Sequence, residues 1–331
     1  MIKIAIIGMG RMGRIHLDNL SRKINGVELT MVVDPKNDGQ KFALDNGVKN
    51  VSNSVNAIIE NPEIDAVVIR SPSSTHCEYV IKFAKAGKAI FCEKPIDMSL
   101  QKATKAISII SKLNVPIMIG FNQRFDNNFS KVKDEISNGK IGELYNLHII
   151  SRDPEPPPIS YIKKSGGLFR DMTIHDFDMA RFIMSSEVVE VFAYGNCLID
   201  SAIGDAGDID SATVLLKFEN GAMATIENSR QASYGYDQRL EVFGSKGVIR
   251  VENPLKSDLK ILTESGTKTD RHLDFFMERY KSSYLEEIKC FINALNTGEK
   301  MPVNGEDGIK AMIIAEAANK SLLENLPVKI N

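Results

Sequence analysis

The chain has 331 residues, which is more than one small domain needs and predicts two domains. Its net charge of −2 gives no basic excess and argues against nucleic-acid and anionic-membrane partners. No apolar run is long enough to span a membrane, and the N-terminal segment lacks a signal-peptide pattern, so we expect a cytoplasmic protein. The four cysteines lie far apart without a C-x-x-C pair, which predicts neither disulfides nor a structural zinc site.

The first third of the chain alternates strand-like and helix-like segments. Short apolar runs typical of buried strands occupy residues 2–7, 27–34, 65–70, 88–95 and 115–121. Segments with helical patterns lie between them, at 11–23, 75–87 and 99–113. Such alternation indicates βαβ units and a parallel sheet. With right-handed crossovers, the prediction is a doubly wound Rossmann domain over residues 1–121.

The pattern changes in residues 122–331. Strand-like segments occur at 144–151, 188–200, 211–218, 222–228 and 239–243, with short turns between several of them. Two helical patterns, at 277–297 and 305–324, close the chain. We expect a second, α+β domain with a large, mostly antiparallel open sheet, whose last helices can pack back on the first domain. The proline-rich residues 153–160 are expected to form a rigid extended loop.

A dinucleotide motif, G-x-G-x-x-G, follows the first predicted strand and opens the first predicted helix. Gly8 allows a tight turn, Gly10 lets the backbone approach a pyrophosphate, and Gly13 lets the helix pack closely on the strand. The helix N-terminus offers N–H groups to the phosphates. Asp34 ends the second strand, about 20 residues on, where its carboxylate accepts ribose hydroxyls and repels a 2′-phosphate. The motif therefore predicts NAD rather than NADP, although the nearby Lys36 could soften that preference.

Acidic and imidazole side chains share one helical face in residues 166–184. On an ideal helix Asp171, His175 and Asp178 fall within an arc of about 60°. A carboxylate beside an imidazole holds its tautomer and stabilises its charged form, as a general base requires. Taken alone, the segment equally fits a surface histidine with salt-bridging neighbours. A metal site is a third interpretation, but no second histidine cluster or cysteine pair supports it, so we expect no metal.

A lysine ends one of the predicted parallel strands. Lys94 lies in the sequence Cys-Glu-Lys-Pro, and ligands of open α/β sheets bind at the carboxyl ends of strands. An ammonium group at that edge can bond a substrate oxygen and stabilise a developing alkoxide. Pro95 could fix the backbone through a cis peptide bond. A surface lysine at a strand end is the alternative.

Three blocks together resemble the Gfo/Idh/MocA oxidoreductases, and their order and spacing fit that family over essentially the whole chain. They are the sequence GMGRMGRIH at 8–16, EKP at 93–95 and G-G-x-x-x-D-x-x-x-H-D at 166–176. Residues 151–182, 234–247 and 275–288 resemble the inositol 2-dehydrogenases within the family. The resemblance implies a Rossmann domain followed by a domain with an open sheet often used for oligomer contacts. A homo-oligomer, either a dimer or a homotetramer, is therefore expected.

The resemblance also implies site residues. Lys94, Asp171 and His175 are the expected catalytic trio. The expected cofactor contacts are Gly8, Gly10, Arg11, Met12, Gly13, Asp34, Ser71, His76, Glu93 and Lys94. The expected substrate contacts are Arg124, Asp153, His175 and Tyr236. One departure stands out, because Arg70 occupies a position where the family more often has a small residue.

These residues lead to a functional expectation. His175 takes the proton of a ring hydroxyl, Lys94 stabilises the oxygen, Asp171 orients His175 or relays its proton, and hydride passes to NAD. Myo-inositol, oxidised to 2-keto-myo-inositol (scyllo-inosose), is the first expected substrate. Another polyol or sugar, such as scyllo-inositol or an aldose, is the nearest alternative. A non-catalytic NAD-binding regulator on the same fold is an alternative from another class.

Overall fold

The computed structural model describes residues 1–330, which form two compact units. The first unit comprises Met1–Phe125 and Ser283–Lys310. The second comprises Asp126–Ser282 and the residues from Ala311 onward. Within residues 1–330, no helix has both the length and the apolar character needed to cross a bilayer.

The first unit contains a six-stranded sheet in which every paired strand is parallel, in the order β3-β2-β1-β4-β5-β6. Its strands are β1 (Ile2–Ile7), β2 (Val27–Val33), β3 (Asn50–Ser52), β4 (Ala66–Ile69), β5 (Ala89–Cys92) and β6 (Ile117–Ile119). Every residue of β4, β5 and β6 is buried, because helices cover a parallel sheet on both faces. This strand order is that of the doubly wound fold, whose ligands bind where the order reverses, beside β1 and β4. The Rossmann prediction is confirmed.

Helices connect these strands. They are α1 (Arg11–Arg22), α2 (Asn37–Asp45), α3 (Asn56–Ile59), α4 (His76–Lys85) and α5 (Leu100–Leu113), with the short 3₁₀ segments η1 (Ser73–Thr75) and η2 (Asn122–Phe125). The start of α5 is fixed by Ser99, whose hydroxyl accepts the Lys102 N–H at 3.4 Å. Helix α12 (Lys281–Thr297) returns to this unit late in the chain, and its Phe291 packs edge-on against Phe91 of β5, with ring centroids 5.6 Å apart.

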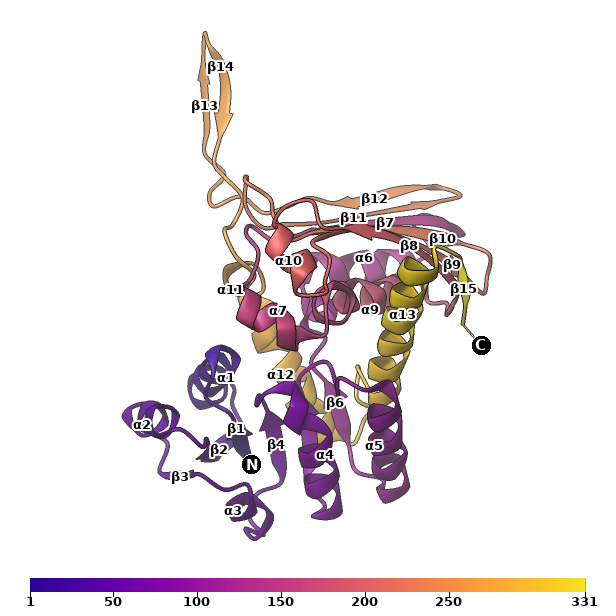
Figure 1. The fold of residues 1–331 in the computed structure, drawn as a ribbon. Helices are drawn as coiled ribbons and strands as arrows, with labels where there is room; N and C mark the ends of the chain where they lie inside the picture. The colour runs from indigo at the N-terminus through magenta and orange to yellow at the C-terminus, as the bar shows by residue number, and fades with distance from the viewer. Residues whose placement is uncertain (331) are drawn as a thin grey trace. The chain divides into compact units, whose positions relative to one another are not determined.

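The second unit contains a seven-stranded sheet in the order β12-β11-β7-β10-β9-β8-β15. Its strands are β7 (Leu144–Arg152), β8 (Val188–Asn196), β9 (Ser211–Phe218), β10 (Met223–Ser229), β11 (Asp237–Gly244), β12 (Gly247–Val251) and β15 (Val328–Lys329). All neighbours are antiparallel except β7 and β10, which are parallel. A separate hairpin, β13 (Lys260–Thr263) and β14 (Gly266–Thr269), projects from this unit (Figure 1). The expected mostly antiparallel sheet is confirmed.

The helices of the second unit lie on one face of its sheet (Figure 1). They are α6 (Asn127–Ser137), α7 (Ile159–Ser165), α8 (Leu168–Asp171), α9 (Thr173–Met184), α10 (Ser201–Asp205), α11 (Phe276–Arg279) and α13 (Gly305–Glu324), which enters from the first unit. Helix α9 packs on β7 and β10 and is buried on nearly every side. Because helices cover only one face of this sheet, the residues of β9 alternate between buried and exposed.

The structure departs from the sequence predictions where the chain changes direction. The helix expected across 166–184 breaks at Met172, so Asp171 ends α8 while His175 belongs to α9. The prediction of one continuous helical face there is wrong. The two glycines at 166 and 167 have positive φ and start α8 on its own turn. The helix expected at 277–297 is likewise interrupted, by Tyr280.

Candidate active site

The glycine turn after β1 has the geometry that each of its glycines permits. Gly8 has φ +94°, and a Cβ there would lie 2.7 Å from the carbonyl oxygen of Arg70. A Cβ on Gly13 would lie 2.0 Å from the Gly8 carbonyl oxygen, so only glycine lets α1 approach the turn this closely. A Cβ on Gly10 would meet nothing within 4 Å. The turn is therefore packed on its inner side and open beside Gly10.

This open position lies at the N-terminus of α1, where Gly10 is the N-cap residue without a side-chain cap. The first turn of α1 comprises Arg11, Met12 and Gly13, and the N–H groups of a first helical turn can bind an anion. Asp34, at the end of β2, accepts the Met9 N–H at 2.6 Å and the Lys36 N–H at 2.8 Å. A carboxylate held beside the turn, together with an open helix N-terminus, fits the ribose and pyrophosphate of a dinucleotide.

The loop after β4 carries two of the expected cofactor residues. The hydroxyl groups of Ser71 and Thr75 lie 2.7 Å apart. His76 is 1% exposed, and its ring nitrogens lie 2.9 Å from the Ser71 carbonyl oxygen and 2.8 Å from the Pro95 carbonyl oxygen. Burial lowers the pKa of His76, so the ring is neutral and donates to one of the two carbonyls. The imidazole thus ties the β4 loop to the β5 loop, and its contact with the cofactor stays a prediction.

The β5 loop carries Glu93 and Lys94, both partly exposed, followed by a cis peptide bond to Pro95. The Glu93 carboxylate accepts the backbone N–H of Lys94 at 2.9 Å through Oε2 and pairs with Arg70 through Oε1. In the same unit, Arg124 donates to Asp307 Oδ1 at 3.1 Å. That pairing holds the guanidinium of Arg124 in place, and its expected substrate contact stays a prediction.

In the second unit Asp171 is held by two groups. The Tyr161 hydroxyl donates to Asp171 Oδ1 at 2.8 Å, and Arg230 Nη1 donates to Oδ2 at 3.3 Å. Arg230 is 1% exposed, and its Nη2 also lies 3.6 Å from Asp208. Two carboxylates thus compensate one buried guanidinium. The sequence reasoning missed Tyr161 and Arg230, because an arginine after a strand and a tyrosine in a short helix carry no motif.

The N-terminal turn of α9, which carries His175, is fastened to the sheet by Asn228 of β10. The Asn228 amide nitrogen donates to Asp176 at 2.8 Å, and its oxygen accepts the Thr173 hydroxyl at 2.7 Å. Asp176 and Thr173 flank His175 in the helix and are at most 1% exposed. These bonds fix the rotation of α9 and leave His175 partly exposed. Asp178 belongs to the same helix and is 1% exposed.

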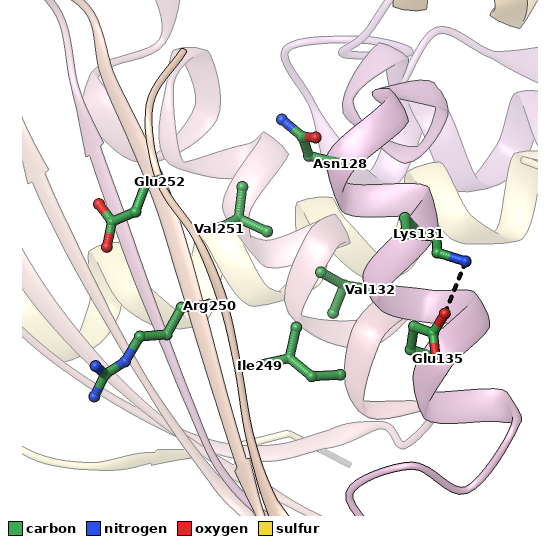
Figure 2. Close-up of a pocket in the computed structure, with 8 residues that line it drawn as sticks. All are labelled: Asn128, Lys131, Val132, Glu135, Ile249, Arg250, Val251 and Glu252. Carbon is green, nitrogen blue, oxygen red and sulfur yellow. Dashed lines mark ion pairs between the residues drawn. The ribbon is translucent and has the colours of Figure 1, made fainter. Parts of the chain in front are cut away.

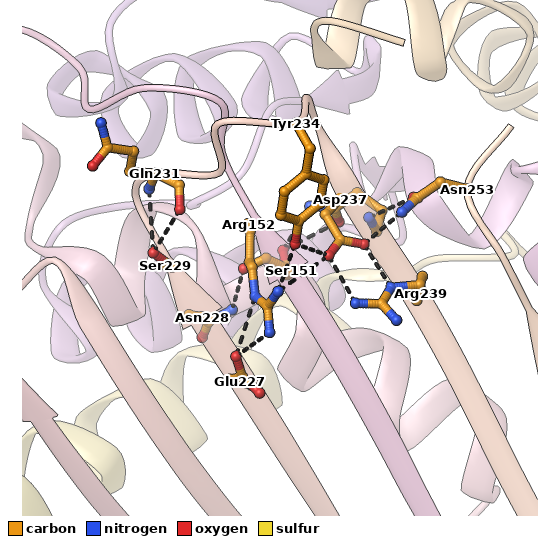
Figure 3. Close-up of polar contacts among 11 residues, drawn as sticks. Ser151, Arg152, Glu227, Asn228, Ser229, Gln231, Tyr234, Asp237, Arg239 and Asn253 are labelled. Atoms are coloured by element: carbon orange, nitrogen blue, oxygen red, sulfur yellow. Dashed lines mark hydrogen bonds and ion pairs between the residues drawn. The ribbon is translucent and has the colours of Figure 1, made fainter. Parts of the chain in front are cut away.

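The remaining expected substrate residues lie at one end of the second sheet. Arg152, the last residue of β7, pairs with Asp237, the first residue of β11, so the neighbouring Asp153 and Tyr236 continue from the same sheet end. Figure 3 shows the polar network that holds this end. Asp237 accepts the Tyr234 hydroxyl at 2.6 Å and Arg239 Nε at 2.7 Å. Burial raises the pKa of Asp237, but these bonds outweigh it and keep the pKa below its usual range.

Two surface pockets of the second unit are lined by none of the expected catalytic or substrate residues. The first, about 270 Å³, lies between α6 and β12, where Val132 and Ile249 face each other (Figure 2). The second, about 820 Å³, is lined by the helix-free face of β7 to β10, including Arg152 and Glu227. Within residues 1–330 no group of three or more histidine, cysteine, aspartate or glutamate side chains is placed to hold a metal ion.

Asp176 generates a pH prediction. Burial raises its pKa to about 7, with Asp153 adding to the rise and the bond from Asn228 opposing it. The folded form therefore binds more protons than the unfolded form, and the free energy of unfolding falls as pH rises from about 4 to about 7. Asp176→Asn removes this titration. We expect the variant to match the wild type near pH 5 and to be more stable at pH 8, measured by urea denaturation.

Asp205→Asn, at an exposed position, is the control for these urea denaturation measurements. It should leave the dependence of the unfolding free energy on pH unchanged. A variant Asp176→Asn whose stability still falls as steeply as that of the wild type between pH 5 and pH 8 would contradict the assignment.

The comparisons with known proteins identify the family of the chain. Residues 2–121 match the oxidoreductase family with an NAD-binding Rossmann fold, and residues 129–250 match the GFO/IDH/MocA C-terminal domain. The chain is 48% identical to the myo-inositol 2-dehydrogenase of Thermotoga maritima, covering 99% of this chain and 98% of that protein. It is 44% identical to the inositol 2-dehydrogenase of Rhizobium meliloti, covering 99% of each.

A solved structure is also similar, the scyllo-inositol dehydrogenase of Lactobacillus casei with bound NAD(H) and scyllo-inositol. The TM-score is 0.92 at 30% identity, and the match covers 99% of this chain and 98% of that one. The family predicted from the sequence is thus confirmed, and with it an enzyme that uses NAD. The chain belongs to the Gfo/Idh/MocA family of NAD-binding oxidoreductases.

Proposed function

We propose that this enzyme oxidises one secondary alcohol of a cyclic polyol to a ketone, with myo-inositol as the first substrate and 2-keto-myo-inositol as the product. The observation that carries the proposal is the 48% identity, over nearly the whole of both chains, to a protein named myo-inositol 2-dehydrogenase. Lys94, Asp171 and His175 stand in a chain of that similarity at the positions where the family motif has its catalytic residues.

His175 acts as the general base in this proposal. Its imidazole is the side chain whose ordinary pKa lies closest to neutrality, and it takes the proton of the reacting hydroxyl. Asp171, held by Tyr161 and Arg230, orients the imidazole or relays its proton. Two donors already hold the Asp171 carboxylate in place, so it need not reorient when the imidazole becomes charged. This preorganisation favours the protonated imidazole over the neutral one.

Lys94 acts on the substrate oxygen. Its ammonium group donates to the hydroxyl oxygen and stabilises the negative charge that grows there as the proton leaves. NAD⁺, when bound, supplies the acceptor for the hydride of the same carbon. Asp153 and Tyr236, at one end of the second sheet, together with Arg124 in the first unit, are the proposed contacts to the other hydroxyl groups.

The cofactor contacts proposed in the first unit are those of the glycine turn and the two neighbouring loops. The open side of Gly10 and the first-turn N–H groups receive the pyrophosphate, and Asp34 receives the ribose hydroxyls. Ser71 follows β4, His76 begins α4 and Glu93 follows β5. A reducing compartment such as the cytoplasm is the proposed location, because all four cysteines are free thiols.

Self-association through the helix-free face of the second sheet is also proposed. Tyr194, Leu215, Met223 and Phe243 project from that face and are 58%, 47%, 56% and 50% exposed. Several large apolar side chains exposed on one sheet face are a feature of interaction sites. A dimer or a homotetramer is the assembly expected from the resemblance.

A second candidate function is the same chemistry on scyllo-inositol, since a solved structure with 30% identity holds that polyol. The deciding experiment is a panel of myo-inositol, scyllo-inositol and aldoses with NAD⁺, read as NADH absorbance. We expect the highest kcat/KM with myo-inositol. A higher value with scyllo-inositol would transfer the assignment to the second candidate, and NADH binding without turnover of any polyol would favour the non-catalytic regulator.

The His175→Ala variant tests the base directly. We expect kcat to fall by roughly 10²- to 10⁴-fold, because proton removal from the hydroxyl is no longer assisted. NAD⁺ binding should persist, since the cofactor contacts lie in the first unit, and calorimetry measures this separately. Unchanged turnover in a folded variant would eliminate the assigned role.

Light scattering of the purified chain tests the assembly. We expect the mass of a dimer or tetramer, and Leu215→Lys with Phe243→Glu should shift it toward the monomer, because charges replace apolar contacts on the open face. Leu44→Lys with Leu113→Glu, at two exposed leucines of the first unit, is the matched control for the added charges. A monomeric wild-type chain at micromolar concentration would refute the proposal.

A further inference from the structure

Arg70 is a fully buried charge behind the cofactor motif. It follows β4 directly, and its side chain has no exposed surface. The guanidinium carbon lies 4.7 Å from the centre of the Phe91 ring. It pairs with Glu93 of the β5 loop and, at 3.1 Å, with Glu287 of α12. Neither the cofactor motif nor the proposed mechanism uses this residue.

The two carboxylates that pair with Arg70 have different surroundings. Burial raises the pKa of Glu287 to about 7, with Arg70 opposing the rise, and Oε1 of Glu287 lies 3.5 Å from His16 Nε2. Burial lowers the pKa of His16 well below its usual value, so that ring is neutral. Glu93, by contrast, keeps some exposure, at 18% of its side chain. Glu93 is the better-solvated partner of the arginine.

Glu93 connects Arg70 to the catalytic loop. Its Oε1 pairs with Arg70, while its Oε2 accepts the backbone N–H of Lys94 at 2.9 Å. The same Oε2 lies where a side chain at position 120 would need space, because a Cβ added to Gly120 would lie 3.1 Å from it. One carboxylate is thus divided between a buried guanidinium and the backbone of Lys94.

The backbone of Arg70 connects to the other half of the cofactor site. The position of an added Cβ on Gly8 lies 2.7 Å from the Arg70 carbonyl oxygen and 2.9 Å from the Ser71 nitrogen. The Arg70 N–H donates to the Ile7 carbonyl oxygen at 2.8 Å. The residue therefore touches the glycine turn with its backbone and the lysine loop, through Glu93, with its side chain.

We propose that Arg70 is a positioning residue for Lys94, acting through Glu93, in the reaction that this enzyme catalyses. The guanidinium sets the orientation of the Glu93 carboxylate, and the carboxylate fixes the backbone at Lys94. Glu287 is a second anchor that compensates the buried charge without reaching the loop. The inference rests on the proposed function, because it gives Lys94 a role on the substrate oxygen.

Arg70→Lys tests the proposal, because lysine keeps the charge but cannot make the forked contact. We expect kcat to fall by about 10- to 100-fold, the loss typical of a catalytic group displaced by about 1 Å. The KM for NAD⁺ should stay close to the wild-type value. With inositol deuterated at the reacting carbon, the isotope effect on kcat should rise, because a misplaced Lys94 slows the chemical step.

Glu287→Gln is the matched control. It disturbs the same buried cluster and the same arginine but leaves the pair between Arg70 and Glu93. Its kcat and isotope effect should stay close to those of the wild type, with active sites counted by NADH titration. A purely structural role for Arg70 predicts the opposite, namely that both variants lose folded protein without a change in isotope effect.

Glu93→Gln covers the case in which Arg70→Lys does not fold. It should reproduce the fall in kcat and the rise in isotope effect, and the double variant should be no worse than the worse single variant. Wild-type kcat in Arg70→Lys, or in Glu93→Gln if only that variant folds, would overturn the proposal. So would an equal loss in Glu287→Gln.

The wild-type enzyme separates this proposal from the proposed function. If the wild type turns over no polyol, the proposed function fails, and crystals of Arg70→Lys decide the inference alone. The proposal expects the Glu93 carboxylate to leave the Lys94 N–H in that variant. A retained bond would overturn it.

Discussion

The close approach of α1 to the turn after β1 is the constraint on which the cofactor half depends. The missing side chain of Gly13 lets the helix rest on the Gly8 carbonyl oxygen. The helix N-terminus is thereby directed at the open side of Gly10, and the Met9 N–H is brought to Asp34. A methyl group at Gly13 would push the helix away and separate the anion site from the carboxylate. The absence of one Cβ thus sets the geometry of two proposed cofactor contacts.

Buried polar groups play the corresponding part in the second unit. Asn228 bonds Thr173 before His175 and Asp176 after it, and Arg230 bonds Asp171. Such groups are costly to bury, and only a full set of partners compensates them. The positions of these buried groups are therefore fixed, and they in turn fix the backbone that carries the neighbouring side chains. If His175 is the base we propose, it needs such an anchor, because apolar packing alone tolerates small rotations of the helix.

The first unit uses the same principle at Arg70 and Glu93. A guanidinium without exposed surface requires carboxylates, and one of these carboxylates also accepts the N–H of Lys94. In both units, then, a buried arginine fixes an acid that lies beside a residue of the proposed chemistry. Each arginine pairs with two carboxylates of its own unit. One carboxylate of Arg70, Glu287, also lies 3.5 Å from His16.

The sequence by itself determined the elements whose signals are local. The glycine motif, Asp34 at a strand end and the alternation of strands with helices follow from backbone sterics and periodicity, and they predicted the Rossmann unit and NAD. The family blocks identified Lys94, Asp171 and His175. Only the tertiary structure decided the break at Met172, because no glycine or proline between residues 168 and 184 signals it. It alone revealed Tyr161, Arg230, Asn228 and the pairs of Arg70, because these contacts join residues 10 to 217 positions apart in the sequence. Partners so distant are chosen by packing and by the cost of burying charge, and no local pattern in the chain records that choice.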